Sequence, residues 1–308
     1  MMKRRKILVR ILLAYTLFIS ACVYVVLPED LEPVGDGTAI ELWSALITGV
    51  ETSTSGDLHI DIAIRNDTGD WSAMQAVEGK PAILTTSDGK TTDCDTVFIG
   101  TGGHRLAPGF QARGFTTGTK DDPQIQPLYV ECKGAVISKG ARLSIDYVSF
   151  TGILDDYDPQ ANKTEEVLEL GLDDVVADLS YPIGSPVEGL VQPAGEGITG
   201  LSDNIVTLVD VQRGETGLQF TWENFNPTKF PLKTHIGTPP VIGSDGIIYG
   251  PFETLDMAPI PITPPNEKVE WTTDVTVPAD VQDFYILLSV ESKKPRTYLN
   301  YVLDITDK

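Results

Sequence analysis

The stretch Leu58–Asn66 constrains the fold of this chain more than any other. Apolar and polar residues alternate along it, so one face of an extended strand carries Leu58, Ile60, Ile62 and Ile64. The other face is polar, which predicts a strand with one side against a core. The alternation returns 160 positions later in residues 217–222, where Asn226 takes the place of Asn66. The chain therefore has to satisfy the same strand pattern twice.

Three further landmarks recur in the same order. Ser87-Asp88-Gly89 returns as Ser244-Asp245-Gly246 at an offset of 157, residues 115–117 as 271–273 at 156, and residues 143–147 as 297–301 at 154. Short loop deletions between two copies of one unit produce such a slowly falling offset. Each Asp-Gly pair also favours a tight turn between two strands. We therefore predict an all-β chain with two similar β-sandwiches in tandem.

The composition divides the 308 residues into five segments. They are a membrane anchor or signal segment (1–30), a tether (31–38), a first sandwich (39–154), an acidic, Pro-containing join (155–200) and a second sandwich (201–308). The 28 Gly and 21 Pro residues disfavour long helices beyond the N-terminal segment. Inside the join, residues 164–179 fit either a short helix or an edge strand.

The N-terminal segment changes charge along its length. A basic cluster precedes the apolar run 7–27 and an acidic cluster follows it: Lys3, Arg4, Arg5 and Lys6, then Glu29, Asp30 and Glu32. Since basic flanks stay in the cytoplasm, both sandwiches are expected outside it, behind a single-pass transmembrane helix. Residues 11–27 carry no charge and suffice, at the short end, to span a bilayer core. Two alternatives fit as well: a lipoprotein with lipidated Cys22, and a secreted protein cleaved near Ser20-Ala21.

The net charge of -21 is unevenly distributed. Of the 23 basic residues five lie before residue 11, whereas all 44 acidic residues follow Pro28. Such an acidic body repels phosphate backbones, which excludes nucleic acid as an expected partner. A basic protein or a component of the cell envelope remains a possible partner.

Two of the three cysteines, Cys94 and Cys132, lie in strand-like stretches of the first sandwich. In an oxidising compartment they could form a disulfide across the sandwich, closing a loop of about forty residues. Two buried free thiols are the alternative.

No catalytic constellation stands out. The chain has only His59, His104 and His235, and no Gly-x-Ser-x-Gly motif. His59 and Asp61 share the polar face of one strand, but no third metal ligand is indicated. The glycine-rich residues 100–104 precede neither a Lys-Ser/Thr pair nor a helix pattern, so we expect a loop there instead of a phosphate site.

The acidic join offers weak calcium candidates. Asp155, Asp156 and Asp158 are hard oxygen donors, but their spacing lacks the central Gly and the alternation of an EF-hand loop. We therefore expect a solvated linker, and no cofactor.

Two sets of short motifs follow one order along the chain. The first is residues 58–66, Asp88-Gly89, Pro108-Gly109 and 128–130, and the second is 218–226, Asp245-Gly246, Pro264-Pro265 and 284–286. They resemble bacterial exported immunoglobulin-like domains of unknown function, namely the immunoprotective extracellular domains and the similar telomeric-repeat-binding-factor-like domains. The second set departs from the pattern with Pro265-Asn266 where Pro-Gly is expected. The resemblance implies immunoglobulin-like sandwiches outside the cytoplasm and implies no reaction.

These patterns together predict a membrane-tethered extracytoplasmic module that binds a partner or serves as structure, without catalysis. The alternative is a hydrolase of cell-envelope polymers, or an accessory protein of such an enzyme, that works through carboxylates. A third possibility is a pure spacer.

Overall fold

The computed structural model describes residues 43–119, 122–151, 163–176, 191–193, 198–199, 204–232, 238–250, 262–291 and 298–305. They all belong to one compact unit, Glu41–Lys308. Strands, turns and loops make up the described residues, and no helix occurs among them. The predicted all-β, β-sandwich-like fold is therefore confirmed.

Several predictions fall outside the described residues. They concern the anchor segment 1–30 with Cys22, and the calcium candidates Asp155, Asp156 and Asp158. A search of the described part of the chain finds no helix with the length and hydropathy that a membrane crossing requires.

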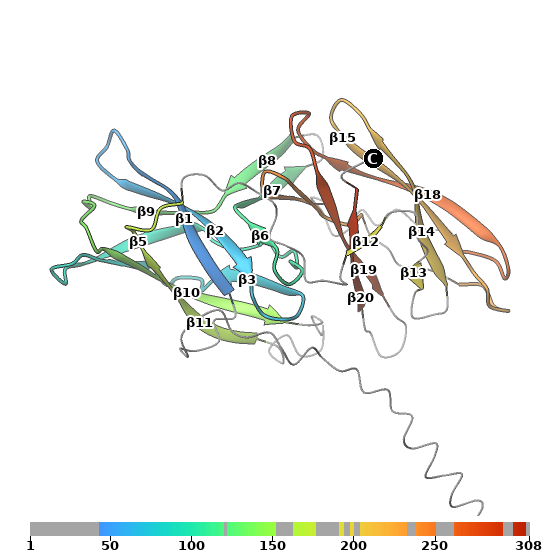
Figure 1. Cartoon of the computed structure of the whole chain (residues 1–308), viewed down its shortest axis with the longest axis horizontal. Coiled ribbons are helices and arrows are strands. Elements are labelled where there is room, and N and C mark those ends of the chain that lie inside the picture. The colour runs from blue at the N-terminus through green and yellow to red at the C-terminus, as the bar shows by residue number, and fades with distance from the viewer. Residues whose placement is uncertain are drawn as a thin grey trace, which may run out of the picture. The chain divides into compact units, whose positions relative to one another are not determined.

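The described strands form three sheets (Figure 1). We call residues 43–171 the first half, with β1 (Trp43–Thr52), β2 (Leu58–Asn66), β3 (Ser72–Ala76), β4 (Ala82–Thr85), β5 (Thr91–Phe98), β6 (Gln111–Ala112), β7 (Gly114–Thr119), β8 (Asp122–Pro127), β9 (Tyr129–Cys132), β10 (Arg142–Thr151) and β11 (Lys163–Gly171). Residues 191–305 are the second half, with β12 (Val191–Pro193), β13 (Ile198–Thr199), β14 (Ile205–Arg213), β15 (Gly217–Phe225), β16 (Val241–Gly243), β17 (Ile247–Tyr249), β18 (Lys268–Thr276), β19 (Phe284–Glu291) and β20 (Tyr298–Asp304).

The first half is built on a nine-stranded sheet in the order β1-β2-β9-β5-β4-β10-β11, with β3 on β10 and β6 on β2. Strand β5 pairs with β4 up to Cys94 and with β9 from Asp95 onward, so it connects the two parts of this sheet. The alternation in β2 has the predicted effect, because its apolar residues are all 0% exposed: Leu58, Ile60, Ile62 and Ile64.

The second half contributes most of a seven-stranded sheet, β12-β20-β19-β16-β17-β7-β8, which is apolar on both faces. Ile242 and Ile248 pack into the core of the first half, whereas their neighbours Val241 and Ile247 pack into a second core. The four-stranded sheet β13-β14-β15-β18 supplies the other wall of that second core, with Leu208, Phe220 and Trp222. The seven-stranded sheet therefore carries a hydrophobic core on each side.

Of residues 164–179, for which the sequence allowed a helix or an edge strand, those up to Gly171 form an edge strand. Strand β11 pairs antiparallel with β10 from Arg142↔Gly171 to Phe150↔Lys163. Only one side of its second part is buried, at Leu168 and Leu170. Residues 163–171, which we expected in the join, thus extend the sheet of the first half.

The β1–β2 hairpin of the first half and the β14–β15 hairpin of the second have the same irregularity. Strands β1 and β2 pair antiparallel with a register shift between Ile47 and Gly49, and β14 and β15 do so with a shift between Leu208 and Asp210. In both cases one residue of the first strand has no partner in the second, as in a β-bulge.

Asn66, at the end of β2, organises the turn that follows. Its Nδ2 donates to the carbonyl oxygens of Asp70 and Leu106, both at 2.8 Å, and its Oδ1 accepts from N and Oγ1 of Thr68 at 3.0 and 2.7 Å. The residue is 0% exposed. Asn66 and Thr68 form an Asn-x-Thr sequence, and this hydrogen-bond network explains why both residues are present. The side-chain amide of Asn66 is not presented to solvent.

Asn226 makes the same contacts in the second half. Its Nδ2 donates to the carbonyl oxygens of Phe230 and Thr263 at 2.7 and 2.9 Å. Its Oδ1 accepts from N and Oγ1 of Thr228 at 2.9 and 2.7 Å. Each bond has its counterpart at Asn66, so the recurrence noticed in the sequence has a geometric basis.

The departure at Pro265-Asn266 also has a simple explanation. Gly109 and Asn266 both donate a backbone hydrogen bond of 2.7 Å, to the carbonyl oxygens of Asn66 and Asn226. Both also have positive φ, 79° for Gly109 and 57° for Asn266. Asn is among the non-glycine residues that adopt this conformation most readily, so it replaces Gly at this position.

The four sequence landmarks differ in how well they hold. The two Ser-Asp-Gly turns occupy the same place, between β4 and β5 and between β16 and β17. The matches of residues 115–117 with 271–273 and of 143–147 with 297–301 are wrong, however. Phe115 lies in β7, which pairs with β17, whereas Trp271 lies in a strand that pairs with β15. Residues 143–147 lie in β10, which pairs with β4, and the strand that pairs in the same way with β16 is β19, not the strand of residues 297–301.

Candidate functional site

The two halves meet through a strand pair. Strand β7 of the first half pairs in parallel with β17 of the second, with Ile247 opposite Gly114 and Ile248 opposite Phe115. Beside this pair, the amide of Arg113 donates to the carbonyl oxygen of Gly246 at 2.9 Å. The β7–β8 hairpin thereby becomes the edge of the seven-stranded sheet, as Figure 1 shows.

Thr116 adds side-chain hydrogen bonds to this junction. Its Oγ1 donates to the carbonyl oxygen of Ile248 at 3.4 Å and accepts from the amide of Gly250 at 3.1 Å. Both Thr116 and Gly250 are buried. One hydroxyl of the first half thus satisfies two backbone groups of the second.

His104 packs on the same segment. A Cβ atom added to Gly250 would lie 2.4 Å from Cε1 and 2.5 Å from Nε2 of His104, so the ring is in direct contact with the backbone of Gly250. Burial lowers the pKa of His104 to about 4, because the charged imidazolium loses its hydration there. His104 is therefore neutral at pH 7. The glycine-rich loop before it is a structural part of the junction, with no helix among its residues 100–104.

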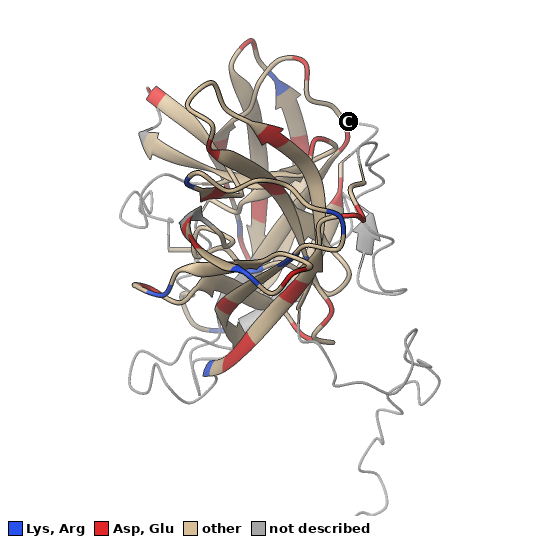
Figure 2. Ribbon diagram, turned by 90° about the vertical axis from the view of Figure 1, so that its left-hand side faces the viewer, with Lys and Arg blue, Asp and Glu red and all other residues tan. Residues whose placement is uncertain are grey.

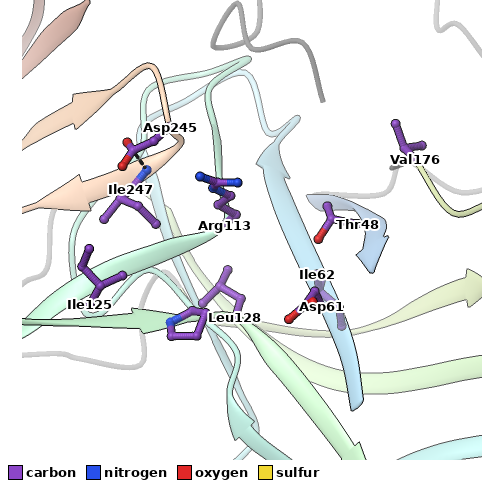
Figure 3. A pocket seen from close by; sticks show the side chains of 10 residues that line it. Thr48, Asp61, Ile62, Arg113, Ile125, Leu128, Val176, Asp245 and Ile247 are labelled. Atoms are coloured by element: carbon purple, nitrogen blue, oxygen red, sulfur yellow. Dashed lines mark hydrogen bonds between the residues drawn. The ribbon is translucent and has the colours of Figure 1, made fainter. Parts of the chain in front are cut away.

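A pocket of about 550 Å³ opens next to the junction (Figure 3). It is lined by Thr48, Asp61, Ile62, Arg113, Ile125, Pro127, Leu128, Val176, Asp245 and Ile247. Ile62, Leu128 and Ile247 are buried, whereas Arg113 and the apolar residues Ile125 and Pro127 are exposed. Both halves contribute residues, so the pocket depends on the junction.

Asp61 is held by its neighbours in and beside β2. His59 Nε2 lies 3.0 Å from Asp61 Oδ1, and the His59 ring stacks on Tyr129 with ring centroids 4.4 Å apart. The β1 irregularity places Gly49 beside the carboxylate, where a Cβ would lie 2.7 Å from Asp61 Oδ2. The sequence placed His59 and Asp61 on one polar strand face without predicting a metal site there, and in the structure the two side chains form a hydrogen-bonded pair.

Asp245 is held by the turn between β16 and β17. Its Oδ1 accepts from the amide of Ile247 at 3.1 Å, and its Oδ2 accepts from the hydroxyl of Tyr249 at 2.5 Å. Burial and the Asp245 carboxylate both raise the pKa of Tyr249, so the phenol keeps its proton. The negative charge of Asp245 therefore has a fixed position.

Arg113 is fixed through its backbone. Its amide bonds to Gly246 of the second half, and its carbonyl oxygen accepts from the amide of Leu128 at 2.9 Å. In the view of Figure 3 its side chain lies between those of Asp245 and Asp61. Nothing in the sequence selects Arg113 and Asp245 as residues of one pocket, because they lie far apart in the chain.

Metal binding finds no support in the described residues. Nowhere in that part of the chain do three or more His, Cys, Asp or Glu side chains gather as a metal site would require. In the view of Figure 2, Asp and Glu of the described residues are spread over several strands and loops.

Cys94 and Cys132 form a disulfide. It joins β5 to its neighbour β9, directly beside the pair Asp95↔Glu131. The bond therefore links adjacent strands and does not run across the sandwich as we expected.

No family model matches the chain, and no curated protein matches it either. Among solved structures, the E. coli chaperone DraB is 12% identical over 84% of this chain and 96% of its own, with a TM-score of 0.19. A red sea bream transglutaminase is 9% identical over 88% and 34%, with a TM-score of 0.19. The Salmonella enterica SafA pilin in complex with the SafB chaperone is 10% identical over 87% and 98%, with a TM-score of 0.16. Similarity at this level assigns neither family nor function.

Proposed function

We propose that the chain is a membrane-tethered extracytoplasmic module of two immunoglobulin-like sandwiches, which binds a partner or ligand without catalysis. The observation that carries this proposal is the shared seven-stranded sheet with the pocket beside it. It joins two sandwiches into one body and creates a concave site to which both contribute. Binding sites in proteins often lie where two such units meet.

The tandem arrangement is supported by the pairing registers. The pair Arg65↔Gln111 on β2 matches the pair Phe225↔Lys268 on β15. The two partner residues, Gln111 and Lys268, are 157 positions apart in the chain. At the other end of the same strands, Leu58↔Cys132 matches Leu218↔Val275. Here the partner residues, Cys132 and Val275, are only 143 positions apart. The first half thus has 14 additional residues between Gln111 and Cys132. They coincide with the β7–β8 hairpin, so we infer an insertion that joins two copies of one unit.

The location is supported by two independent features. The basic-apolar-acidic order of the N-terminal segment favours export of all that follows residue 28. The Cys94–Cys132 disulfide fits an oxidising compartment.

Protease accessibility tests the location. The full-length protein is tested in cells whose outer envelope layers are permeabilised while the inner membrane stays intact. Added protease should remove Glu41–Lys308 and leave a short membrane-bound N-terminal fragment. Intact mass of that fragment reports on Cys22. If the body is protected until the inner membrane is lysed, the location is wrong. Capture of an envelope component by the full chain, lost on removal of the body, then tests binding.

A second candidate is suggested by Asp61 and Asp245, two carboxylates that line one pocket. Paired carboxylates hydrolyse glycosidic bonds when one of them acts as an acid. Both carboxylates already accept hydrogen bonds within the protein, Asp61 from His59 and Asp245 from Ile247 and Tyr249. Turnover of a glycan or peptide panel, abolished by Asp61→Asn or Asp245→Asn, would replace the binding function with this one.

A further inference from the structure

The pocket carries both signs of charge beside exposed apolar residues. Asp61 comes from β2, Asp245 from the β16–β17 turn, and Arg113 from the start of the β7–β8 hairpin. Ile125 and Pro127 are exposed apolar residues of the same lining. A ligand that carries only one sign of charge would lie next to a pocket residue of the same sign, so a matching ligand carries both signs.

The two carboxylates are preorganised, and the arginine starts from a fixed backbone position. Asp61 is held by His59, and Asp245 by the amide of Ile247 and the hydroxyl of Tyr249. The backbone of Arg113 is bonded on both sides, to Gly246 and Leu128. Groups fixed before binding lose little entropy when a ligand arrives.

We propose that this pocket binds a small zwitterion with an apolar portion, such as an amino acid or a short peptide. The ligand carboxylate contacts the Arg113 guanidinium, its ammonium group contacts Asp61, and its side chains cover the exposed Ile125 and Pro127. The volume of about 550 Å³ lies within the usual range for small-ligand sites. The inference rests on the proposed binding function and specifies its ligand class.

Each simpler ligand class leaves one charge opposed. A pure cation would face Arg113, and a pure anion would face Asp61 and Asp245, at a cost that apolar contacts do not offset.

Calorimetry with full-length protein in nanodiscs tests the ligand class. The probes are leucyl-leucine, its N-acetyl form, its C-terminal amide and the doubly blocked form. We expect measurable binding of leucyl-leucine and at least about 10-fold weaker binding of each blocked form, since each loses one charge-assisted contact. Equal binding of the amide, or of the N-acetyl form, would overturn the proposal, as would absence of binding at about 10 mM.

Two variants assign the site. Arg113→Gln and Asp61→Asn should each weaken leucyl-leucine binding about 10-fold or more. Arg65→Gln makes the same charge change as Arg113→Gln at an exposed position of β2, and it should leave binding within about 2-fold. Two variants are used because either may lose its fold; circular dichroism identifies that case, and the other then decides. Equal weakening by Arg65→Gln would show an effect of net charge alone. Because the protease test of location uses no ligand, its failure is distinguishable from a wrong ligand class.

Discussion

Replacing Thr116 with Val should loosen the junction between the halves. Thr116 is only 8% exposed, and Val has nearly the same shape. The change removes the Oγ1 atom that accepts from the amide of Gly250 and donates to the carbonyl oxygen of Ile248. Packing is retained, so the effect isolates these two hydrogen bonds.

The magnitude follows from the Gly250 amide. Gly250 is buried, so its N–H loses a partner without gaining water. An unsatisfied buried donor costs about 1–3 kcal/mol. The bond to Ile248 is long at 3.4 Å and adds little. We therefore expect Thr116→Val to lower the free energy of unfolding by about 1–3 kcal/mol.

Urea denaturation at pH 7 measures this change, with tryptophan fluorescence as the probe. Thr117→Val is a matched control, because Thr117 is the next residue in β7 and its hydroxyl makes only an exposed 3.5 Å bond to Gln124. The control should stay within about 0.5 kcal/mol of the parent. If Thr116→Val matches the control, the junction bonds do not contribute as argued.

Three further changes can be measured in the same way. Asn66→Ala and Asn226→Ala should each cost about 2–4 kcal/mol, because each leaves several buried turn groups unpaired; a cost in only one half would show that the two networks are not equivalent. Replacing Cys94 and Cys132 together by Ala should cost about 4 kcal/mol, from the closure of a loop with a sequence separation of 38, and an unchanged urea midpoint would contradict this. The pKa of His104 is lowered from 6.5 to about 4, so the unfolded chain binds the proton at a higher pH than the folded chain does. The free energy of unfolding should therefore fall by on the order of 3 kcal/mol as pH drops from 6.5 toward 4. His104→Gln should flatten that part of the pH profile.

Alternation along the strands predicted much of the fold. Where one face of a strand meets the core, as in Leu58–Asn66, the pattern has period two and both ends are marked by turn residues. Residues 164–179 stayed ambiguous because charged and apolar residues are mixed there. Pairing with β10 over the whole of β11 resolves the ambiguity, and such pairing is a tertiary effect.

The shared sheet could not be predicted from alternation. In β19, Phe284, Ile286 and Leu288 face one core, whereas Leu287 faces the other and Tyr285 packs against it. A strand buried on both faces has a continuous apolar run, and residues 284–288 contain that signal. What the run does not reveal is which segment covers the second face. The false match of Phe115 with Trp271 has the same origin, since it treated the β7–β8 hairpin as part of the repeat.

The candidate site was only partly visible in the sequence. Asp61 was noticed because it shares a strand face with His59. Arg113 and Asp245 were not, because the contact between the Arg113 amide and Gly246 spans the two halves. Exposed charged residues are common in a chain with 44 acidic and 23 basic residues, so composition cannot select them.

The shared sheet also decides how a ligand can enter the pocket. Separating the halves would expose Ile242, Ile248, Leu287 and Val302, which pack in the core of the first half. At about 1.5–3 kcal/mol for each buried side chain, opening would cost about 6–12 kcal/mol, comparable to the whole stability of a domain. The pocket walls therefore do not close around a ligand by a hinge motion of the halves. Recognition has to rely on groups already in place, which is why the held positions of Asp61, Asp245 and Arg113 matter more than their number.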